Sequence, residues 1–270
     1  MRLDPRRSIA GVALAITAGS AHAQASLTAD LGLNSQYIWR GVTSTNRFVV
    51  QPELTLTLPV RGLTLAAGAW GNIEPVRYDG PRDISSLEGL PGPFITQSEA
   101  WGEIGGSIAK RVDAAFGVHG YFYPDVGDLA DFRTTELYLT LGTEAFVSPT
   151  LSINYDIGPI RGAYVEAGLS RAVTGERRGA LTLSVLAGYS AGQGEDPSGR
   201  DLAYFERDGL THLDAATSAT FTLGRMVIAP EAHMIVASDA LAMVVAPDAT
   251  RRTKLWFGTT LSWSTSREGR

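Results

Sequence analysis

The chain has 270 residues, of which 44% are hydrophobic and 19% are charged, with a formal net charge of −5 and no cysteine. Soluble domains usually carry about 25% charged residues, so this chain is poor in charge. The missing cysteine excludes disulfides and a cysteine-linked lipid anchor, and the negative charge argues against nucleic acid as a partner.

Residues 1–23 have the pattern of a cleaved secretory signal. Arg2, Arg6 and Arg7 form a basic start, residues 9–18 are a short apolar run, and "AHA" ends at Ala23 as a small-x-small cleavage site. The run is shorter than the ~20 residues that a transmembrane helix needs. We therefore expect the folded domain to start at residue 24; from there the chain has 20 basic and 27 acidic residues.

From Ser26 onward, apolar and polar residues alternate with a period of two, which predicts β-strands. In "SLTADLGLN" the apolar positions are leucine or alanine, and the alternate positions are mostly polar. We expect twelve such strands. They span residues 26–40, 47–58, 63–72, 96–108, 113–123, 134–144, 150–158, 162–171, 180–190, 210–223, 226–237 and 253–263.

The connections between these strands alternate between short and long, with residues 159–161 as a short exception among the long ones. An even number of strands of about 9–14 residues, joined in this way, is typical of an antiparallel transmembrane β-barrel. Short turns then face the periplasm, and the longer, acid-rich loops face outward. We expect residues 24–270 to form one all-β barrel in a Gram-negative outer membrane, with lipid and lipopolysaccharide as surroundings.

Aromatic and proline residues test this interpretation. Aromatic rings favour the headgroup level of a membrane. We place Tyr37, Trp39, Phe48, Phe94 and Phe122 at the outer rim, and Phe146, Phe221 and Trp263 at the inner rim. Pro52 and Pro230 fall inside predicted strands, where a closed barrel has no free edge, so we expect a bulge at each.

The stretch "SQYIWRGVTSTNRFVVQPELTL", followed by "GLTLAAGAWGN", resembles a family of uncharacterised bacterial outer-membrane proteins known as TorF-like porins. The residues that match are Tyr37, Arg40, Gly41, Ser44, Gln51, Gly68, Trp70, Gly71 and Asn72. "ELYLTLG" at residues 136–142 is similar to a recurring strand of that family. The second strand departs from the pattern at Pro52-Glu53, where a glycine pair is more usual. The resemblance covers about the first fifty residues after the signal and implies a porin.

Strand parity assigns a polar set of side chains to the barrel lumen, where they would meet solutes. These residues are Arg40, Glu53, Glu99, Glu103, His119, Tyr121, Glu136, Tyr138, Asp156, Glu166, His212, Asp214, Glu231 and His233. Carboxylates outnumber bases in this set, and clustered negative charge in a channel favours cations. The alternative is a hydrogen-bonded network that only stabilises a narrow barrel.

Two parts of this set invite sharper interpretations. A turn at residues 110–112 would place Glu103 opposite His119, as a pH-responsive gate or a satisfied polar contact. A turn at residues 224–225 would make Asp214 and His233 diagonal neighbours. Two histidines with carboxylates can bind a metal, but the spacing matches no metal signature. We expect a hydrogen-bond network there, with no metal and no cofactor.

The predicted function is passive diffusion of small solutes through a weakly cation-preferring, acidic lumen. The alternatives are a non-conducting barrel with a structural or surface-binding role and, less favoured, an outer-membrane lipid-modifying enzyme. "GYSAG" at residues 188–192 matches the G-x-S-x-G nucleophile motif. That motif needs a strand–turn–helix context, whereas here it ends a strand and enters a glycine-rich loop. We therefore expect no catalytic residue.

Overall fold

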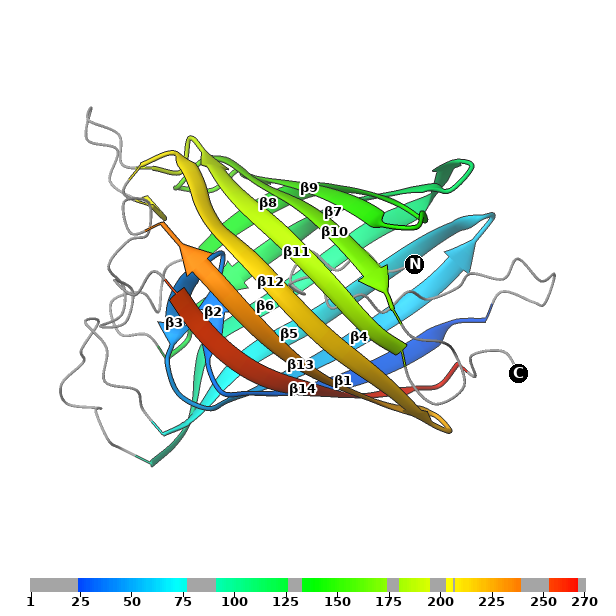
Figure 1. Ribbon diagram of the computed structural model, residues 1–270, viewed down its shortest axis with the longest axis horizontal. Coiled ribbons are helices and arrows are strands. Elements are labelled where there is room, and N and C mark those ends of the chain that lie inside the picture. Colours follow the sequence, from blue (N-terminus) through cyan, green and yellow to red (C-terminus); the bar gives the residue numbers. More distant parts are fainter. Residues whose placement is uncertain are drawn as a thin grey trace.

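The computed structural model describes residues 24–76, 91–125, 133–173, 180–194, 203–205, 207–238 and 253–266. The predicted signal, residues 1–23, lies outside these ranges. Large parts of the longer connections between strands also lie outside them. Within them, twelve strands close into one antiparallel barrel (Figure 1). None of the described segments forms an apolar helix long enough to cross a membrane.

Each barrel strand pairs with its neighbours along the chain, and β1 closes the barrel by pairing with both β4 and β14. The barrel strands are β1 (Ser26–Asn34), β4 (Val49–Val60), β5 (Leu63–Val76), β6 (Pro91–Ala109), β7 (Val112–Phe122), β8 (Arg133–Thr143), β9 (Ser148–Asp156), β10 (Gly162–Ala172), β11 (Ala180–Ala191), β12 (Gly209–Leu223), β13 (Met226–Ala237) and β14 (Thr253–Ser264). The sequence prediction of a twelve-stranded antiparallel barrel is confirmed.

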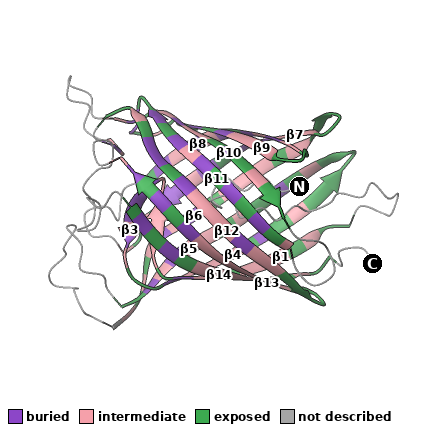
Figure 2. Ribbon diagram, in the orientation of Figure 1, coloured by how far each residue is buried: buried purple, intermediate pink, exposed green. Residues whose placement is uncertain are grey.

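The two faces of the wall differ in polarity, as the alternation predicted. In β8, Glu136, Tyr138 and Thr140 point inward and are at most 4% exposed, whereas Leu139 between them is 39% exposed on the outside. Buried and exposed positions alternate along the strands in the same way around the barrel (Figure 2). The interior is therefore polar and the outer surface apolar, which is the reverse of a soluble β-sandwich.

Tight turns join several of the described strand pairs at one end of the barrel. Arg61 and Gly62 connect β4 to β5 with φ angles of 50° and 85°. Two consecutive residues with positive φ form the turn that matches the twist of a β-hairpin. Arg111, in the turn between β6 and β7, also has a positive φ of 64°.

The register between β6 and β7 corrects one expectation. Glu103 lies opposite Gly117, and His119 lies opposite Trp101 rather than Glu103. The turn takes only residues 110–111, and a bulge between Ser107 and Ala109 moves the ladder by a further residue. The predicted Glu103–His119 pair was wrong for this reason.

The prolines also differ from expectation, because the register of their strands does not shift beside them. Pro52 lies opposite Leu31 of β1, and Pro230 lies opposite Thr259 of β14. On the other side of Pro52, the β4–β5 pairing stops at Glu53 and resumes in the same register beyond the proline. Because proline lacks an N–H donor, the interruption of the ladder accommodates it without a bulge.

The largest departure from the sequence prediction concerns the first strand. The wall strand β1 ends at Asn34, which pairs directly with Val49 of β4. The chain between them leaves the wall and forms a small hairpin of β2 (Tyr37–Trp39) and β3 (Val42–Thr45). Figure 1 shows this hairpin within one end of the barrel.

The position of the hairpin corrects the placement of two aromatic residues. Tyr37 packs on Trp70, and Trp39 packs on Tyr121, so both rings lie inside the barrel instead of at its outer rim. Phe122 and Phe146 are exposed, and their placement at opposite membrane rims stays a prediction.

Candidate functional site in the lumen

The β2–β3 hairpin crosses the lumen and is attached to the wall at several points. Below, "the hairpin" means residues 36–47. Tyr37 donates a hydrogen bond to Gln97 Oε1 of β6 at 3.1 Å, and Thr45 donates to Glu74 Oε1 of β5 at 2.6 Å. These contacts come from one side of the hairpin and hold it against β5 and β6.

The turn of the hairpin is attached to the opposite part of the wall. Lys254 of β14 donates from its Nζ to the carbonyl oxygen of Gly41 at 2.8 Å. Gly41 has a φ of +84°, and a Cβ there would lie 2.7 Å from the side chain of His212. Only glycine lets the turn approach β12 this closely.

Arg40, the other turn residue, makes the strongest contact between the hairpin and the wall. Its two terminal nitrogens donate to the two carboxylate oxygens of Glu136 at 2.7 and 2.6 Å. The two side chains are 7% and 0% exposed. This bidentate geometry is the strongest form of a charge-assisted hydrogen bond between side chains.

Aromatic rings enclose the guanidinium of Arg40. Its Cζ lies 4.4 Å from the ring centre of Trp39 and 4.2 Å from that of Tyr164. Tyr121 donates a further hydrogen bond to Glu136 Oε2 at 2.8 Å. Burial alone would lower the pKa of Arg40, but the charge and hydrogen bonds of Glu136, together with Tyr121 and Tyr164, hold that pKa well above its ordinary value. The site therefore holds a permanent cation.

The connection between β11 and β12 adds a second segment to this constriction. Tyr204 packs edge-on against Trp39 with ring centres 4.9 Å apart, and Phe205 stacks on Tyr164 at 5.8 Å. Phe205, Tyr164 and Val42 of the hairpin form a fully buried apolar cluster. The hairpin is thus held by apolar packing as well as by polar contacts.

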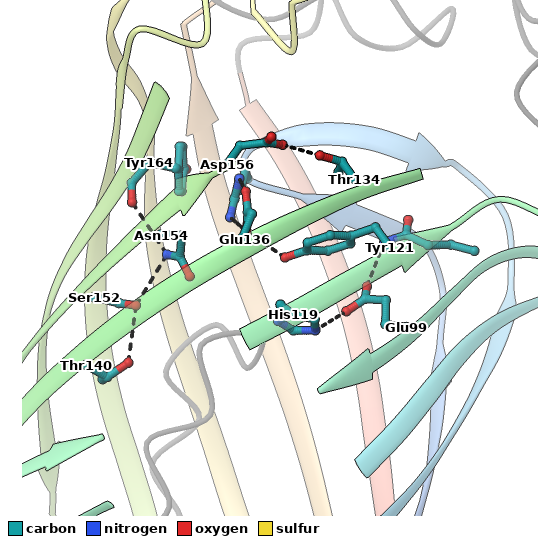
Figure 3. Close-up of polar contacts among 12 residues, drawn as sticks. Glu99, His119, Tyr121, Thr134, Glu136, Thr140, Ser152, Asn154, Asp156 and Tyr164 are labelled. Atoms are coloured by element: carbon teal, nitrogen blue, oxygen red, sulfur yellow. Dashed lines mark hydrogen bonds and ion pairs between the residues drawn. The ribbon is translucent and has the colours of Figure 1, made fainter. Parts of the chain in front are cut away.

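A network of polar side chains lies on the wall beside Arg40 (Figure 3). His119 Nε2 lies 2.8 Å from Glu99 Oε2, and the His119 ring stacks on Tyr121, which contacts Glu136. Glu136 faces Asp156 across the β8–β9 ladder. Two carboxylates therefore stand side by side in the wall at the point where Arg40 binds.

An amide ladder crosses four neighbouring strands near the base of the hairpin. Asn34 donates to Gln51, Gln51 donates to Asn72, and Asn72 donates to Thr96, each at 2.8 Å. These side chains come from β1, β4, β5 and β6 in order. They are linked in series by these hydrogen bonds and line the lumen with neutral polar groups.

The second predicted cluster is present on β12 and β13. His233 Nδ1 lies 2.8 Å from Asp214 Oδ2, and its Nε2 lies 3.6 Å from Glu231 Oε2. Asp214 and His233 are diagonal neighbours, as predicted. Trp256 stacks on the His233 ring at 4.1 Å. Within the described residues, no group of three or more such side chains has the arrangement of a metal site.

A cavity of about 160 Å³ lies between the hairpin and the wall. Its lining combines carboxylates, amides and aromatic rings of the wall with the inner surface of the hairpin. The lining includes Asp30, Glu53, Glu99, Glu166, Glu231, Trp39, Trp70, Tyr121, Trp256 and Arg40. This volume can hold several water molecules or a small polar solute.

The structure places all fourteen predicted site residues inside the barrel, where they are buried or half-buried. Three groups bring most of them into contact: Arg40, Glu136 and Tyr121; Glu99 and His119; and Asp214, Glu231 and His233. Glu103 belongs to a fourth contact, because Tyr138 donates to its Oε2 at 2.9 Å. Whether these residues bind a solute stays a prediction.

Sequence reasoning missed the residues that build the constriction. Tyr37 and Trp39 were correctly predicted to lie in a strand, but they were placed at the outer rim instead of inside the lumen. Tyr204 and Phe205 lie in a connection with no periodic pattern, so no local signal marks them. Gln97 occupies an inward position of β6, and parity could have identified it.

The GYSAG motif does not form a nucleophile elbow. Ser190 is fully buried in β11, and its hydroxyl donates to Asp208 Oδ1 at 3.1 Å. In the described residues that follow, β11 ends at Ala191 and no helix begins. The strand–turn–helix geometry that exposes a nucleophile is therefore not formed around this serine.

Comparison with a known family covers about half of the chain. Residues 17–159 match the model of a family described as a bacterial protein of unknown function, Gcw_chp. This description is not the TorF-like one, so that resemblance stays a prediction. No curated protein matches the chain.

Solved structures share the fold. An outer membrane channel from Pseudomonas putida F1 is 10% identical with a TM-score of 0.58, over 91% of this chain and 97% of that one. The KdgM porin is 8% identical with a TM-score of 0.49, over 88% and 99%. LpxR from Salmonella typhimurium is 8% identical with a TM-score of 0.48, over 88% of this chain and 99% of that one. At these identities the likeness shows the barrel fold alone.

Proposed function

Since the chain belongs to the Gcw_chp family of bacterial proteins of unknown function, we infer its activity from its own geometry. We propose that the protein is an outer-membrane channel for small polar solutes. The observation that carries this proposal is the polar-lined cavity of about 160 Å³ inside a closed barrel. The apolar outer surface suits lipid, and the polar interior suits water and solutes. Residues 1–23 would export the chain and be removed.

The hairpin sets the size limit of this channel. It spans the lumen at the level of Arg40 and is attached to β5, β6, β8 and β14. Solutes would pass through the space between the hairpin and the wall, so we expect a small conductance in the resting state. The end that contains the hairpin would face the cell exterior, because the longer connections lie at that end.

The charge of the lumen supports a preference for cations. Glu53, Glu99, Glu166 and Glu231 line the cavity together with Asp30, and Arg40 is the one lining lysine or arginine within the described residues. A low-dielectric wall strengthens the attraction of such a cluster for a passing cation. In a salt gradient, the reversal potential should therefore show cation selectivity, and a clear anion selectivity would contradict this part of the proposal.

The test of the channel is conductance in planar bilayers. We would compare the wild-type barrel with a variant in which residues 36–47 are replaced by two glycines. Asn34 and Val49 are already paired, so the shortened connection joins adjacent ends without strain on the wall. Replacing the Lys110-Arg111 turn by Asn-Gly is the matched control, because it changes a connection at the other end.

We expect a small current for the wild type and the turn control, and a several-fold larger current for the shortened variant. A second candidate function, a non-conducting barrel with a structural or surface-binding role, is favoured by the dense attachment of the hairpin. That candidate predicts no wild-type current. Absence of current in the shortened variant as well would refute the channel proposal.

A further inference from the structure

The receptor of the Arg40 guanidinium belongs almost entirely to the barrel wall. Glu136 comes from β8, Tyr121 from β7 and Tyr164 from β10, whereas the hairpin supplies only Arg40 itself and Trp39. A wall carboxylate beside an aromatic face, here that of Tyr164, is a general recognition site for planar cations. The wall would present this site whether or not the hairpin occupies it.

Contacts within the wall hold the receptor in place without Arg40. Tyr121 donates to Glu136 at 2.8 Å, and its ring stacks on His119 at 4.7 Å. His119 is in turn held by Glu99 at 2.8 Å. Removal of the Arg40 side chain should therefore leave a vacancy of the shape of a guanidinium, still aligned to bind one.

Charge around the receptor favours a further cation. Glu136 stands opposite Asp156 on the next strand, and Glu166 stands one strand further. Arg40 forms an ion pair with one of these three carboxylates. Asp156 accepts hydrogen bonds from Thr134 and from the backbone N–H of Gly158, and Glu166 lines the cavity. Carboxylates gathered in a low-dielectric region attract a solute cation that enters it.

The cavity borders the receptor at Tyr121 and Arg40. Arg40, Tyr121 and Glu166 are all part of its lining. A cation that moves through the lumen passes the carboxylates of Glu231 and Glu53, which line the same cavity, and can reach the site of Arg40. The hairpin therefore places a tethered guanidinium at the end of an acidic path.

We propose that the wall receptor formed by Glu136, Tyr121 and Tyr164 is a binding site for solutes that bear a guanidinium group, and that Arg40 occupies it when no solute is bound. This inference deepens the proposed channel function and rests on it for its biological meaning. A guanidinium solute competes with Arg40 for Glu136, and its binding weakens the attachment of the hairpin. The channel is thus opened by the chemical class that it carries.

Tethering explains why the receptor rejects weak competitors. A group on a short loop acts at an effective concentration of roughly millimolar or above. A free guanidinium must exceed that concentration, or make additional contacts in the cavity, to displace Arg40. The wild type should therefore bind a minimal probe weakly, and loss of the Arg40 side chain should reveal the site.

The test is calorimetric titration of the purified full-length barrel with methylguanidinium. Arg40→Ala should bind it at least about tenfold more tightly than the wild type does, because the tethered competitor is removed. Adding Glu136→Gln to Arg40→Ala should reduce that affinity again by at least about tenfold. N-methylurea, which is similar in shape but neutral, should not bind.

Matched controls isolate the receptor. Arg171→Ala removes an arginine that stacks on Phe146 at the other end of the barrel, and should leave binding as in the wild type. Glu144→Gln, added to Arg40→Ala, changes an exposed carboxylate just beyond β8 and should leave the affinity unchanged. If Arg40→Ala does not fold, Arg40→Gln replaces it, because its amide can still donate to Glu136.

Equal affinity of Arg40→Ala and its Glu136→Gln derivative would overturn the proposal. So would equal affinity of the wild type and Arg40→Ala. In bilayers, methylguanidinium should reduce the sodium current of Arg40→Ala, while the double variant should be insensitive. If no variant conducts, the channel function fails, whereas the calorimetric comparison still decides whether the receptor binds guanidinium.

Discussion

The Arg40–Glu136 pair offers a direct test of how the hairpin is held. Replacing either residue by alanine removes hydrogen bonds of 2.7 and 2.6 Å and leaves the other charge in a site that is 7% exposed or less. Loss of one partner of a buried ion pair costs about 3–5 kcal/mol. We expect each single variant to lower the free energy of unfolding by about that amount.

The double variant isolates the interaction energy between Arg40 and Glu136 from their contacts with other residues. With both side chains removed, neither charge stays buried, so the loss should be smaller than the sum of the single losses by about 2–3 kcal/mol. The contacts of Arg40 with the rings of Trp39 and Tyr164 disappear in the Arg40 single variant and in the double variant. They therefore cancel in the double-mutant cycle.

The assay is unfolding of the barrel in lipid vesicles by urea, followed by tryptophan fluorescence. Urea is preferable to guanidinium chloride, because the guanidinium ion would compete for Glu136 if the receptor binds it. Glu144→Ala serves as the control, with an expected change within about 0.5 kcal/mol. Additive losses, with a coupling below about 0.5 kcal/mol, would refute the view that this pair holds the hairpin.

Two further predictions concern the wall. Gly117→Ala should lower the free energy of unfolding by about 1–3 kcal/mol, because its Cβ would overlap the Tyr138 ring, whereas Gly71→Ala, with its nearest neighbour at 3.7 Å, should be nearly neutral. Leu139→Arg should cost about 2–4 kcal/mol in vesicles, because Leu139 is 39% exposed near the middle of a wall strand. Phe146→Arg, in a connection at the barrel end, should cost about 0–1 kcal/mol. Both comparisons are measured by urea unfolding. An equal loss of unfolding free energy for the two glycine variants would contradict the predicted clash with Tyr138. An equal loss for the two arginine variants would contradict the lipid-facing assignment of Leu139.

The wall could be predicted from sequence because each of its strands carries the signal locally. Leu139 and Glu136 differ in polarity because one faces outward and the other inward, and this difference repeats along every strand. Strand number, chain order and inward residues all follow from that alternation. The Asp214–His233 contact followed as well, because a tight turn at Gly224 leaves little freedom in the pairing.

The pairing register of two strands was harder to predict from sequence where an irregular turn joins them, as between β6 and β7. A bulge beside Ser107 moved His119 away from Glu103 and opposite Trp101, within reach of Glu99. Alternation is unaffected by a shift of two residues, so it says which face a residue takes and not which partner it meets. The identity of the buried contacts therefore depended on hydrogen bonding across the strands.

The hairpin shows most clearly what the sequence pattern could not predict. Residues 26–40 keep a period of two with Ser35 and Ile38 as exceptions, and that pattern predicted one extended strand, whereas the structure has β1 and β2 with a break at residues 35–36. The same pattern arises whether a strand faces lipid or lies inside the lumen, because both environments separate its two sides. Pairing of Asn34 with Val49 closes the wall without the hairpin, and the partners of Arg40 and Gly41 lie on β8 and β14, far along the chain. Only closure of the barrel brings these partners together, so the tertiary structure alone decided that the lumen is occupied.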